Sequence, residues 1–473
     1  MKYQLLPFNF ELFDDSRVFV SNIVGEYQLL SQDDFNRLIQ KELNQESDTF
    51  LNLESKQIVA RDHIDDVINM LATKFRTKKS ILNDFTTLHM VVPTLRCNSS
   101  CIYCQVARKN FDDHSCEMTN ETAKNVISTI FKSPSPNIKI EFQGGEPTSF
   151  FSMVQFMIEE AEYQNAFKRR NLEFVICTNL TLLTKEQVKY LKKHKCYIST
   201  SLDGPASIHN INRPLQSGEN YMEIFEKQLN MIRKVWGDKD CVSALMTTTK
   251  SSLGKFKDIV DEYVRLGFNC IFFRALNPYG FAKQRKDLIA YSVDEFIQSY
   301  KEGLNYIIEL NKKGTFFIEG FASLLLRRIL TPFATGFVDL QSPAGVGIAC
   351  AMYDFDGSVY VSDEARMMAR FKNYTFRLGN VNTDSYQSMF FGELMHKITS
   401  NACTECLPGC STCPYQQYCG ADPVRNTSEQ GDMIGLRPSN EMCKRTKAII
   451  HYIIELLDKH DPEINRIFWS WIR

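Results

Sequence analysis

The sequence lacks long hydrophobic runs, internal repeats, low-complexity tracts and a strong net charge. No apolar stretch reaches the roughly 18 residues that a membrane-spanning helix needs. The formal net charge is −1, so no global basic field exists to attract nucleic acid. The start, MKYQLLPFNFELFDD, has acidic residues and no long apolar segment, unlike a secretory signal. We therefore expect a cytoplasmic protein that uses neither nucleic acid nor a membrane as its partner.

Cysteine, in contrast, is abundant, with 15 residues in a chain of 473. A reducing cytoplasm disfavours disulfides, so cysteines that cluster there point to metal binding or catalysis. The cysteines do cluster, with three at 97–104 and five at 403–419. These two segments are the candidate functional sites.

The middle of the chain alternates between strand and helix patterns. Such alternation predicts a parallel sheet with crossover helices, and six units favour an open, partial (β/α)6 barrel over a full eight-fold barrel. The six expected strands are 87–94, 137–145, 172–179, 196–204, 241–249 and 269–278.

The length exceeds one ordinary core, and we expect three domains, at 1–85, 86–335 and 336–473. The first is a small α+β domain, with two strands around a glycine turn in 17–31 and a helix at 33–43 capped near Ser31 or Asp33. The second is the partial barrel, mostly helical over 283–335. In the third, 343–443 shows little periodicity, which favours a metal anchor, and a helix over 443–471 is interrupted near Pro462.

The first cysteine cluster reads LRCNSSCIYCQ, with Cys97, Cys101 and Cys104 spaced C-x3-C-x2-C. It follows the first barrel strand directly, at the end where α/β barrels place their active sites. Three thiolates can hold three irons of a [4Fe–4S] cluster and leave the fourth iron open, with Tyr103 as an aromatic neighbour. The alternatives are three buried cysteines or a zinc site that lacks its fourth ligand.

This triplet resembles the signature of the radical S-adenosylmethionine (radical SAM) superfamily, and the resemblance covers about 87–280. The segment FQGGEPT (142–148) is similar to the family's second motif, a turn that binds the amino group of S-adenosylmethionine. The resemblance implies that Gly144, Gly145, Glu146 and Pro147 form this turn. Glycines permit close backbone approach, and Glu146 can pair with an ammonium group.

Two later segments resemble the ends of the family's fourth and fifth strands. In CTNLTLL and STSLDGP, the candidates for contacts with cofactor or substrate are Asn179, Ser201 and Asp203; ordinary turn chemistry is the alternative. The segment SLDGPASIHNINR (201–213) is typical of the branch that acts on peptides. Arg213 and Arg274 are candidates to hold a carboxylate, or are ion pairs at the barrel mouth.

The second cysteine cluster resembles the auxiliary iron–sulfur domain called SPASM. The residues that match C-x2-C-x5-C and the final cysteine, and so imply one [4Fe–4S] cluster, are Cys410, Cys413, Cys419 and Cys443. Ser362 and Pro423 stand where the pattern has cysteines. A second auxiliary cluster would use Cys350, Cys403 and Cys406, with Asp363 or Ser362 as a possible fourth ligand. A zinc-binding tail is the alternative. The remaining cysteines, which we expect to be buried apolar residues, are Cys116, Cys177, Cys196, Cys241 and Cys270.

The resemblance implies an oxidoreductase that modifies a ribosomally made peptide or protein. In this family the reduced cluster cleaves S-adenosylmethionine to a 5′-deoxyadenosyl radical, which takes a hydrogen atom from the substrate. The auxiliary domain favours an oxidative modification such as a crosslink, and a flavodoxin- or ferredoxin-like protein would donate electrons. Asp203 and Glu319 are candidates for a general base.

Residues 1–85 resemble the winged-helix-like domain with which many peptide maturases bind a leader peptide; a domain that only supports the barrel is the alternative. The segments LLPFNF, YVSDEARMM and CGADPVRN resemble maturases of the His-Xaa-Ser system, in which a second radical enzyme accompanies the first. Two other functions remain open. One is sulfatase-maturase-like oxidation of Cys or Ser to formylglycine, and the other is a non-enzymatic iron–sulfur carrier or scaffold.

Overall fold

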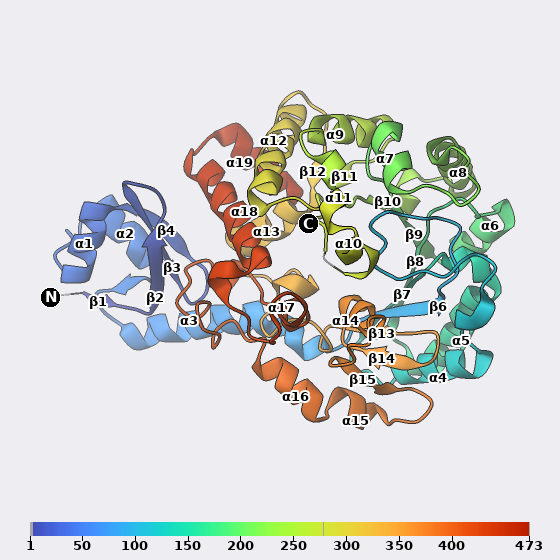
Figure 1. Ribbon diagram of the computed structural model, residues 1–473. Coiled ribbons are helices and arrows are strands. Elements are labelled where there is room, and N and C mark those ends of the chain that lie inside the picture. Colours follow the sequence, from blue (N-terminus) through green and yellow to red (C-terminus); the bar gives the residue numbers. More distant parts are fainter. Residues whose placement is uncertain (1–2, 278, 473) are drawn as a thin grey trace. The chain divides into compact units, whose positions relative to one another are not determined.

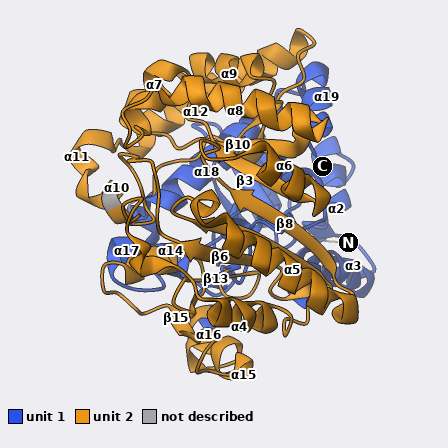
Figure 2. Ribbon diagram, turned by 90° about the vertical axis from the view of Figure 1, so that its right-hand side faces the viewer, with its two compact units in different colours: residues 1–83, 322–345, 399–473 blue, residues 84–321, 346–398 orange. Residues whose placement is uncertain are grey.

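The computed structural model describes residues 3–277 and 279–472, and the chain divides into two compact units. Figure 2 colours the larger unit orange and the smaller unit blue. The larger unit contains 84–321 and 346–398, and the smaller unit contains 1–83, 322–345 and 399–473. The first predicted domain boundary, at 85, lies close to the first boundary between units. The three-domain division itself stays a prediction.

An eight-stranded, mostly parallel sheet forms the larger unit, in the order β10-β9-β8-β7-β6-β13-β14-β15 (Figure 1). Strands β6 to β10 and β13 run parallel, while β14 and β15 are antiparallel additions at one edge. The strands are β6 (Leu88–Thr94), β7 (Asn137–Gly144), β8 (Asn171–Cys177), β9 (Cys196–Ser201), β10 (Val242–Leu245), β13 (Cys350–Tyr353), β14 (Ser358–Tyr360) and β15 (Arg377–Asn380).

Helices cover one face of this sheet, because parallel neighbours need crossover connections. Figure 1 shows α5, α6 and α8 outside the arc of strands β7 to β10. The helices of this unit are α4 (Asn120–Ile130), α5 (Phe151–Lys168), α6 (Lys185–Lys193), α7 (Ala206–Asn212), α8 (Tyr221–Trp236), α9 (Phe256–Arg265), α10 (Gly280–Gln284), α11 (Lys286–Ile289), α12 (Val293–Lys312), α14 (Asp363–Ala369), α15 (Tyr386–Phe390) and α16 (Glu393–Ser400).

The predicted α/β partial barrel is confirmed, and its first five strands lie where the sequence places them. The sixth is shorter than the predicted 269–278: only β11 (Cys270–Ile271) forms, in a parallel pair with β12 (Ile318–Glu319). The backbone N–H of Thr248 donates to the carbonyl of Arg274 at 2.9 Å, so the chain after β11 still runs beside the chain after β10. Pro278, the last residue of the predicted strand, lies outside the described residues.

Strands β13 to β15 were not predicted, because 343–443 shows no clear periodicity. All residues of β13 and β14 are buried, so neither strand carries the alternation of apolar and polar residues that marks a half-exposed strand. β13 pairs with β6 in parallel, with Cys350 opposite Leu88. The cysteine-rich segment therefore starts as part of the main sheet.

The smaller unit begins with the predicted α+β segment. A three-stranded antiparallel sheet has the order β2-β3-β4, and β1 pairs with β5. Gly25, with φ of 80°, lies in the turn between β3 and β4, and Ser31 caps α1 by accepting from the N–H of Asp34. The elements of this segment are β1 (Gln4–Leu5), β2 (Phe8–Leu12), β3 (Arg17–Asn22), β4 (Tyr27–Ser31), α1 (Gln32–Gln40), α2 (Asp48–Ser55), β5 (Val59–Ala60) and α3 (Ile64–Lys79).

The rest of the smaller unit is helical or irregular. Its longer elements are α13 (Gly320–Leu330), α17 (Pro423–Gln430), α18 (Glu441–Asp458) and α19 (Pro462–Trp471). The predicted interruption near Pro462 is confirmed. The backbone N–H of the first helical residue has no partner within the helix, so proline, which lacks this N–H, is tolerated there. Asp461 caps the new helix. Among the residues described, no helix combines the length and apolar character that crossing a membrane requires.

Phe142 on β7 tests the packing of the sheet against its helices. The side chain is fully buried and stacks with Phe174 at 6.4 Å between ring centroids. We expect Phe142→Ala to lower the free energy of unfolding by about 3–5 kcal/mol, because the cavity adds to the lost burial. Urea unfolding followed by circular dichroism measures the change. Tyr163→Ala, at a side chain 65% exposed on α5, is the control, and a similar loss there would contradict the assignment.

Candidate active site

The loop that carries Cys97, Cys101 and Cys104 follows β6 and is held by a distant part of the chain. The N–H of Ser100 donates to the carbonyl of Pro214 at 2.7 Å, and that of Ile102 donates to the carbonyl of Asn212 at 2.9 Å. The side chain of Gln216 donates to the carbonyl of Cys97 at 2.8 Å. The segment 212–216, just after α7, therefore fixes the course of the cysteine loop.

The three thiols of this loop lie near one another. Burial raises the pKa of Cys97 above its ordinary value, and the proximity of Cys101, Glu146 and Cys104 raises it further. Burial likewise raises the pKa of Cys101 to about 11. Iron binding must therefore displace protons from buried thiols. Three thiols gathered in one loop at the carboxyl end of the sheet fit three irons of a [4Fe–4S] cluster.

Gly144 and Gly145 allow the end of β7 to pack against the segment that leads into this loop. A Cβ on Gly144, whose φ is 127°, would lie 2.4 Å from the carbonyl oxygen of Thr94. A Cβ on Gly145 would lie 2.2 Å from the carbonyl oxygen of Arg96. The N–H of Gly145 also donates to the Thr94 carbonyl at 3.0 Å. The glycines are thus required by the chain's own backbone next to Cys97.

Glu146 is buried, and its carboxylate accepts four hydrogen bonds from the protein. Oε1 accepts from the N–H of Thr148 at 3.1 Å, from its hydroxyl at 2.5 Å, and from the hydroxyl of Thr178 at 2.7 Å. Oε2 accepts from the N–H of Asn179 at 2.7 Å. Burial raises the pKa of Glu146, while these hydrogen bonds oppose that rise. The carboxylate joins the ends of β7 and β8, with Pro147 opening a short 3-10 helix beside it.

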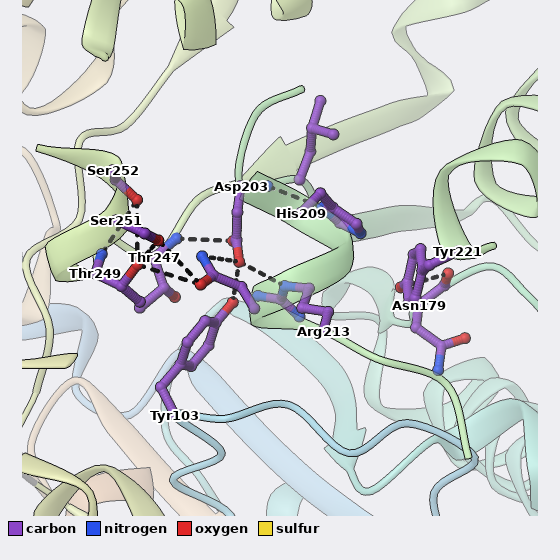
Figure 3. A network of polar contacts seen from close by, with 12 residues as sticks. Tyr103, Asn179, Asp203, His209, Arg213, Tyr221, Thr247, Thr249, Ser251 and Ser252 are labelled. Atoms are coloured by element: carbon purple, nitrogen blue, oxygen red, sulfur yellow. Dashed lines mark hydrogen bonds and ion pairs between the residues drawn. The ribbon is translucent and has the colours of Figure 1, made fainter. Parts of the chain in front are cut away.

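Asn179 connects the end of β8 to the cysteine loop. Its side-chain amide donates to Oδ1 of Asn98 at 2.8 Å and to the hydroxyl of Ser99 at 3.0 Å. Its carbonyl accepts from the hydroxyl of Tyr221 at 3.1 Å (Figure 3). Asn179 therefore positions two residues that lie between the first and second cysteines.

Asp203, fully buried after β9, accepts hydrogen bonds from four directions (Figure 3). Oδ2 accepts from the hydroxyl of Tyr103 at 2.6 Å and from the amide of Asn212 at 3.2 Å, and pairs with Nε of Arg213 at 3.2 Å. Oδ1 accepts from the N–H of Thr247 at 3.2 Å. One carboxylate thus links the cysteine loop, α7 and the chain after β10.

Arg213 is both an ion-pair partner and a neighbour of an aromatic ring. Its guanidinium carbon lies 5.1 Å from the centroid of the Tyr103 ring. Burial would lower the pKa of Arg213, but the nearby Asp203 carboxylate keeps that pKa above its ordinary value. Arg213 therefore stays charged and is already paired within the protein.

Ser201 and Arg274 differ from these residues. Both side chains are half-buried, and neither forms a hydrogen bond or ion pair within 3–277 and 279–472. Ser201 ends β9, and Arg274 lies just after β11. Their polar groups therefore stay available to a bound molecule, unlike those of Glu146 and Asp203.

Glu319, the other predicted candidate for a general base, is also occupied. Its carboxylate accepts from the N–H of Phe273 at 3.1 Å, from that of Phe321 at 3.3 Å and from the hydroxyl of Tyr300 at 2.6 Å. The side chain is fully buried. These hydrogen bonds connect β12 to α12 and to the chain after β11.

The second cysteine set lines one cavity in the smaller unit. The N–H of Cys443 donates to Oδ1 of Asn440 at 2.8 Å, which places this cysteine in the first turn of α18. Burial raises the pKa of Cys413 to about 11, and burial raises the pKa values of the other three thiols as well. The cysteines that line the cavity are Cys410, Cys413, Cys419 and Cys443. These are the four that the sequence predicts as ligands of one cluster.

The predicted second auxiliary cluster draws its cysteines from both units. Cys350, in the larger unit, is buried and donates to the carbonyl of Val361 at 3.4 Å. Cys403, in the smaller unit, donates to Glu405 at 3.1 Å, and Cys406 is exposed. This cluster stays a prediction.

The non-cysteine positions of the auxiliary region have local roles in their helices. Ser362 caps α14 by accepting from the N–H of Ala365 at 3.3 Å, and Asp363 begins that helix. Pro423 begins α17. Across the described parts of the chain, no three His, Cys, Asp or Glu side chains converge closely enough to hold a single metal ion.

Of the cysteines expected to be buried apolar residues, Cys116, Cys196 and Cys241 are buried. Cys177 and Cys270 are only partly buried, and the thiol of Cys177 donates to Glu141 at 3.3 Å.

Gly145→Ala tests whether the glycine turn supports the cysteine loop. The new Cβ collides with backbone, so the loop must shift at a cost of about 1–3 kcal/mol, and the variant should lose most of its iron after anaerobic reconstitution. Iron analysis and visible absorbance measure the loss. Gly237→Ala is the control: its φ is 81°, but its Cβ meets open space. Equal iron in the Gly145 variant and the wild type would refute this role.

Asp203→Asn tests the central carboxylate. The substitution leaves Arg213 buried without its counter-charge, and we expect the free energy of unfolding to fall by about 3–5 kcal/mol. Tyr103→Phe removes one donor only and should cost about 1 kcal/mol. Urea unfolding measures both changes. The control is Asp261→Asn, at an exposed carboxylate, and an Asp203 variant as stable as this control would show that the network contributes little.

Comparison with known proteins agrees with this geometry. Residues 91–262 match the model of the radical SAM superfamily. The chain is 22% identical, over 373 residues, to the cysteine-type anaerobic sulfatase-maturating enzyme of Clostridium perfringens, and the match covers 75% of this chain and 93% of that protein.

Two solved structures have a similar fold. The enzyme anSMEcpe with bound AdoMet and Cp18Cys peptide has a TM-score of 0.66 at 19% identity, covering 80% of this chain and 99% of that chain. SuiB of Streptococcus suis, bound to the precursor peptide SuiA, has a TM-score of 0.53 at 14% identity, covering 92% of this chain and 99% of that chain. The family match and these folds agree with the cysteine loop and the glycine turn: this chain carries a radical SAM domain.

Proposed function

We propose that the chain is a radical SAM maturase, an enzyme that modifies a peptide or protein substrate by hydrogen abstraction. The observation that carries the proposal is the loop of Cys97, Cys101 and Cys104, held at the carboxyl end of a parallel sheet beside the Gly144–Gly145 turn. An electron carrier would need the thiols alone. The turn and the polar network around the loop suit a site that also binds a cofactor.

The three thiols are the proposed ligands of a [4Fe–4S] cluster whose fourth iron binds S-adenosylmethionine. Once bound and reduced, such a cluster would supply one electron for the cleavage of S-adenosylmethionine to methionine and a 5′-deoxyadenosyl radical. Ser201 and Arg274, with unused polar groups, are available for the cofactor or a substrate carboxylate. The hydrogen bond from the Tyr103 hydroxyl to Asp203 fixes the position of this ring within the cysteine loop.

Glu146, Asn179 and Asp203 act in this proposal chiefly as positioning residues. Glu146 and Asp203 accept several hydrogen bonds each from the protein, and the side-chain amide of Asn179 donates to Asn98 and Ser99. These bonds orient the cysteine loop before any cofactor binds. A preorganised loop avoids a reorganisation cost during the reaction. It also helps to keep water away from a reactive radical.

The four-cysteine cavity is the proposed site of an auxiliary [4Fe–4S] cluster, held by Cys410, Cys413, Cys419 and Cys443. Such a cluster would accept the electron that the substrate radical releases, so the net change would be an oxidation. A second auxiliary cluster, on Cys350, Cys403 and Cys406, belongs to the same proposal. Reduction of the first cluster requires an external donor of the flavodoxin or ferredoxin class.

The proposed substrate is a ribosomally made peptide or small protein, and the proposed change is a crosslink. The fold likeness to structures solved with peptides supports a peptide substrate. The N-terminal α+β segment offers a sheet edge for a leader peptide. The resemblance to His-Xaa-Ser maturases adds a second radical enzyme as a possible partner.

A second candidate is the oxidation of a Cys or Ser residue to formylglycine. The match to the sulfatase-maturating enzyme, which covers 93% of that protein, favours this alternative. Product mass separates a crosslink from oxidation of Cys, which also replaces sulfur by oxygen, but not from oxidation of Ser, because a crosslink and Ser oxidation each remove two hydrogens. Fragmentation of the product peptide separates these last two, since a crosslink suppresses cleavage between its two anchor residues.

The experiment begins with anaerobic reconstitution with iron and sulfide, followed by dithionite and S-adenosylmethionine. We expect the wild type to form 5′-deoxyadenosine, measured by chromatography, and Cys97→Ala, Cys101→Ala and Cys104→Ala to lose it. The control is Cys116→Ala, a buried cysteine outside the triplet, which should keep activity. A fully iron-loaded wild type that forms no 5′-deoxyadenosine would overturn the proposal in favour of an iron–sulfur carrier or scaffold.

A further inference from the structure

A second cavity lies within the smaller unit next to the four-cysteine cavity, and Thr404 and Gln416 line both. The volume open to the centre of a water-sized molecule is about 20 Å³, and the cavity is partly open to solvent. The end of α3, the 3-10 helix Ser80–Asp84 that follows it, the last turn of α13 and the segments 334–342 and 404–417 surround it. The residues that line it are Lys78, Lys79, Ile81, Leu82, Arg328, Ala334, Gln341, Ser342, Thr404, Glu405, Gln416 and Gln417.

The positive charges around this cavity outnumber the negative ones. Lys79 pairs with Glu405 at 2.5 Å, and the hydroxyl of Ser342 donates to the same carboxylate. Glu405 is the only acidic residue among those that line the cavity. Lys78 and Arg328 form no ion pair in the part of the chain that the structure describes, although Glu405 attracts Arg328 without contact. Three cations therefore share one carboxylate, and two of them have no direct ionic partner.

Both cations contact neutral groups only. Nζ of Lys78 donates to the carbonyl of Arg328 at 3.2 Å and lies 5.8 Å from the centroid of the Tyr418 ring. Nη2 of Arg328 donates to the carbonyl of Gln417 at 2.8 Å. Nε of Arg328 is buried and has no hydrogen-bond partner among the described residues. The guanidinium thus keeps donors for a further acceptor.

This arrangement is costly without an anion. Burial, followed by repulsion from Arg328, lowers the pKa of Lys78 to about 7; attraction to Glu26 opposes that shift, and repulsion from Lys74 adds to it. A buried charge is normally compensated by a partner of opposite sign. Two neighbouring cations that contact only carbonyls and a ring therefore indicate a site whose partner is a ligand.

We propose that this cavity binds a small oxyanion, a carboxylate or a group such as sulfate or phosphate, between Lys78 and Arg328. A guanidinium offers two parallel N–H donors to such a group, and an ammonium adds a point charge. The same cavity already holds one carboxylate, Glu405, between Lys79 and Ser342. The oxyanion has two possible sources, an acidic side chain of a peptide or a free anion. The inference stands independently of the proposed radical chemistry.

Arg328 also lies near Cys419, one of the four cysteines of the neighbouring cavity. Its charge could therefore compensate a bound auxiliary cluster instead of a separate anion. A cluster in the four-cysteine cavity would not account for Lys78, because Lys78 lines the second cavity and not the cavity of the four cysteines.

The test uses the full-length reconstituted protein and sodium sulfate as the probe, at constant ionic strength set with chloride. Isothermal titration calorimetry should detect saturable binding to the wild type. Lys78→Met and Arg328→Met should each weaken it at least about tenfold, as expected when one of two charge-assisted contacts is lost. Arg328→Lys, which keeps the charge but loses the fork, should fall between. The control is Lys74→Met, on the same helix, where Lys74 pairs with Glu26 and does not line the cavity.

Thermal unfolding is the second readout and does not depend on calorimetry. Without sulfate, Lys78→Met should unfold at the same temperature as the wild type or higher, because it removes an unpaired cation. With sulfate, the wild type should gain stability and the variant should not. A short peptide containing Glu that displaces sulfate, while its Gln counterpart does not, would identify a peptide carboxylate as the source. Displacement by neither would leave a free anion as the ligand.

Two results would overturn the proposal. One is the absence of saturable sulfate and acetate binding to the wild type, or binding that Lys78→Met and Arg328→Met leave unchanged. The other is an Arg328→Met variant with unchanged sulfate affinity but an altered electron paramagnetic resonance spectrum of the auxiliary cluster. That second outcome would show that Arg328 compensates the charge of the auxiliary cluster and not that of a separate anion.

Discussion

The buried carboxylate of Asp203 is the point on which the candidate active site depends. It joins three parts of the chain that are far apart in sequence: Tyr103 in the cysteine loop, Asn212 and Arg213 after α7, and Thr247 after β10. A buried carboxylate is tolerated only when its lone pairs are occupied and its charge is matched, and both conditions hold here. Because these partners follow three different elements, β6, α7 and β10, one carboxylate connects the cysteine loop to two other parts of the larger unit.

The number of hydrogen bonds that a side chain already forms within the protein separates the residues that position the site from those whose polar groups are available to a ligand. Glu146 and Asp203 belong to motifs that suggest contact with a ligand, yet their oxygens already accept hydrogen bonds from threonine, tyrosine, asparagine and backbone groups. A group that is already satisfied gains little from a new partner, because a new bond must replace an old one. Ser201 and Arg274 carry no such commitments within the described residues. In the proposed function, recognition of a ligand's polar groups would therefore rest on those two side chains, because the N–H groups of Gly145 and Glu146 already donate to the carbonyls of Thr94 and Arg96.

Much of this architecture could be predicted from sequence, and the exceptions have physical reasons. The strands near 87, 137, 172, 196 and 241 are apolar runs separated by amphipathic helices, and the spacing of Cys410, Cys413, Cys419 and Cys443 predicts a group of cysteines that the fold gathers around one cavity. Strands β13 and β14 escaped prediction because they are short and wholly buried. The partners of Glu146 and Asp203 are set by strand order, which no local pattern contains. Lys78 and Arg328 are 250 positions apart, and only folding brings them to one cavity.

The two cysteine sites also differ in what holds them. Backbone hydrogen bonds from Ser100 and Ile102 to the segment 212–216 hold the first loop without any metal. Gly145 contributes as well, because its backbone packs too closely against Arg96 to leave room for a side chain. Burial raises the pKa values of Cys97 and Cys101, so metal would enter a loop whose course is already determined and would release protons from these two thiols as it binds. The segment 403–419 has no strand and only one short 3-10 helix, and its backbone bonds close local turns. Such a segment gains little from a core of its own, so a metal cluster would contribute far more to its order than to that of the first loop.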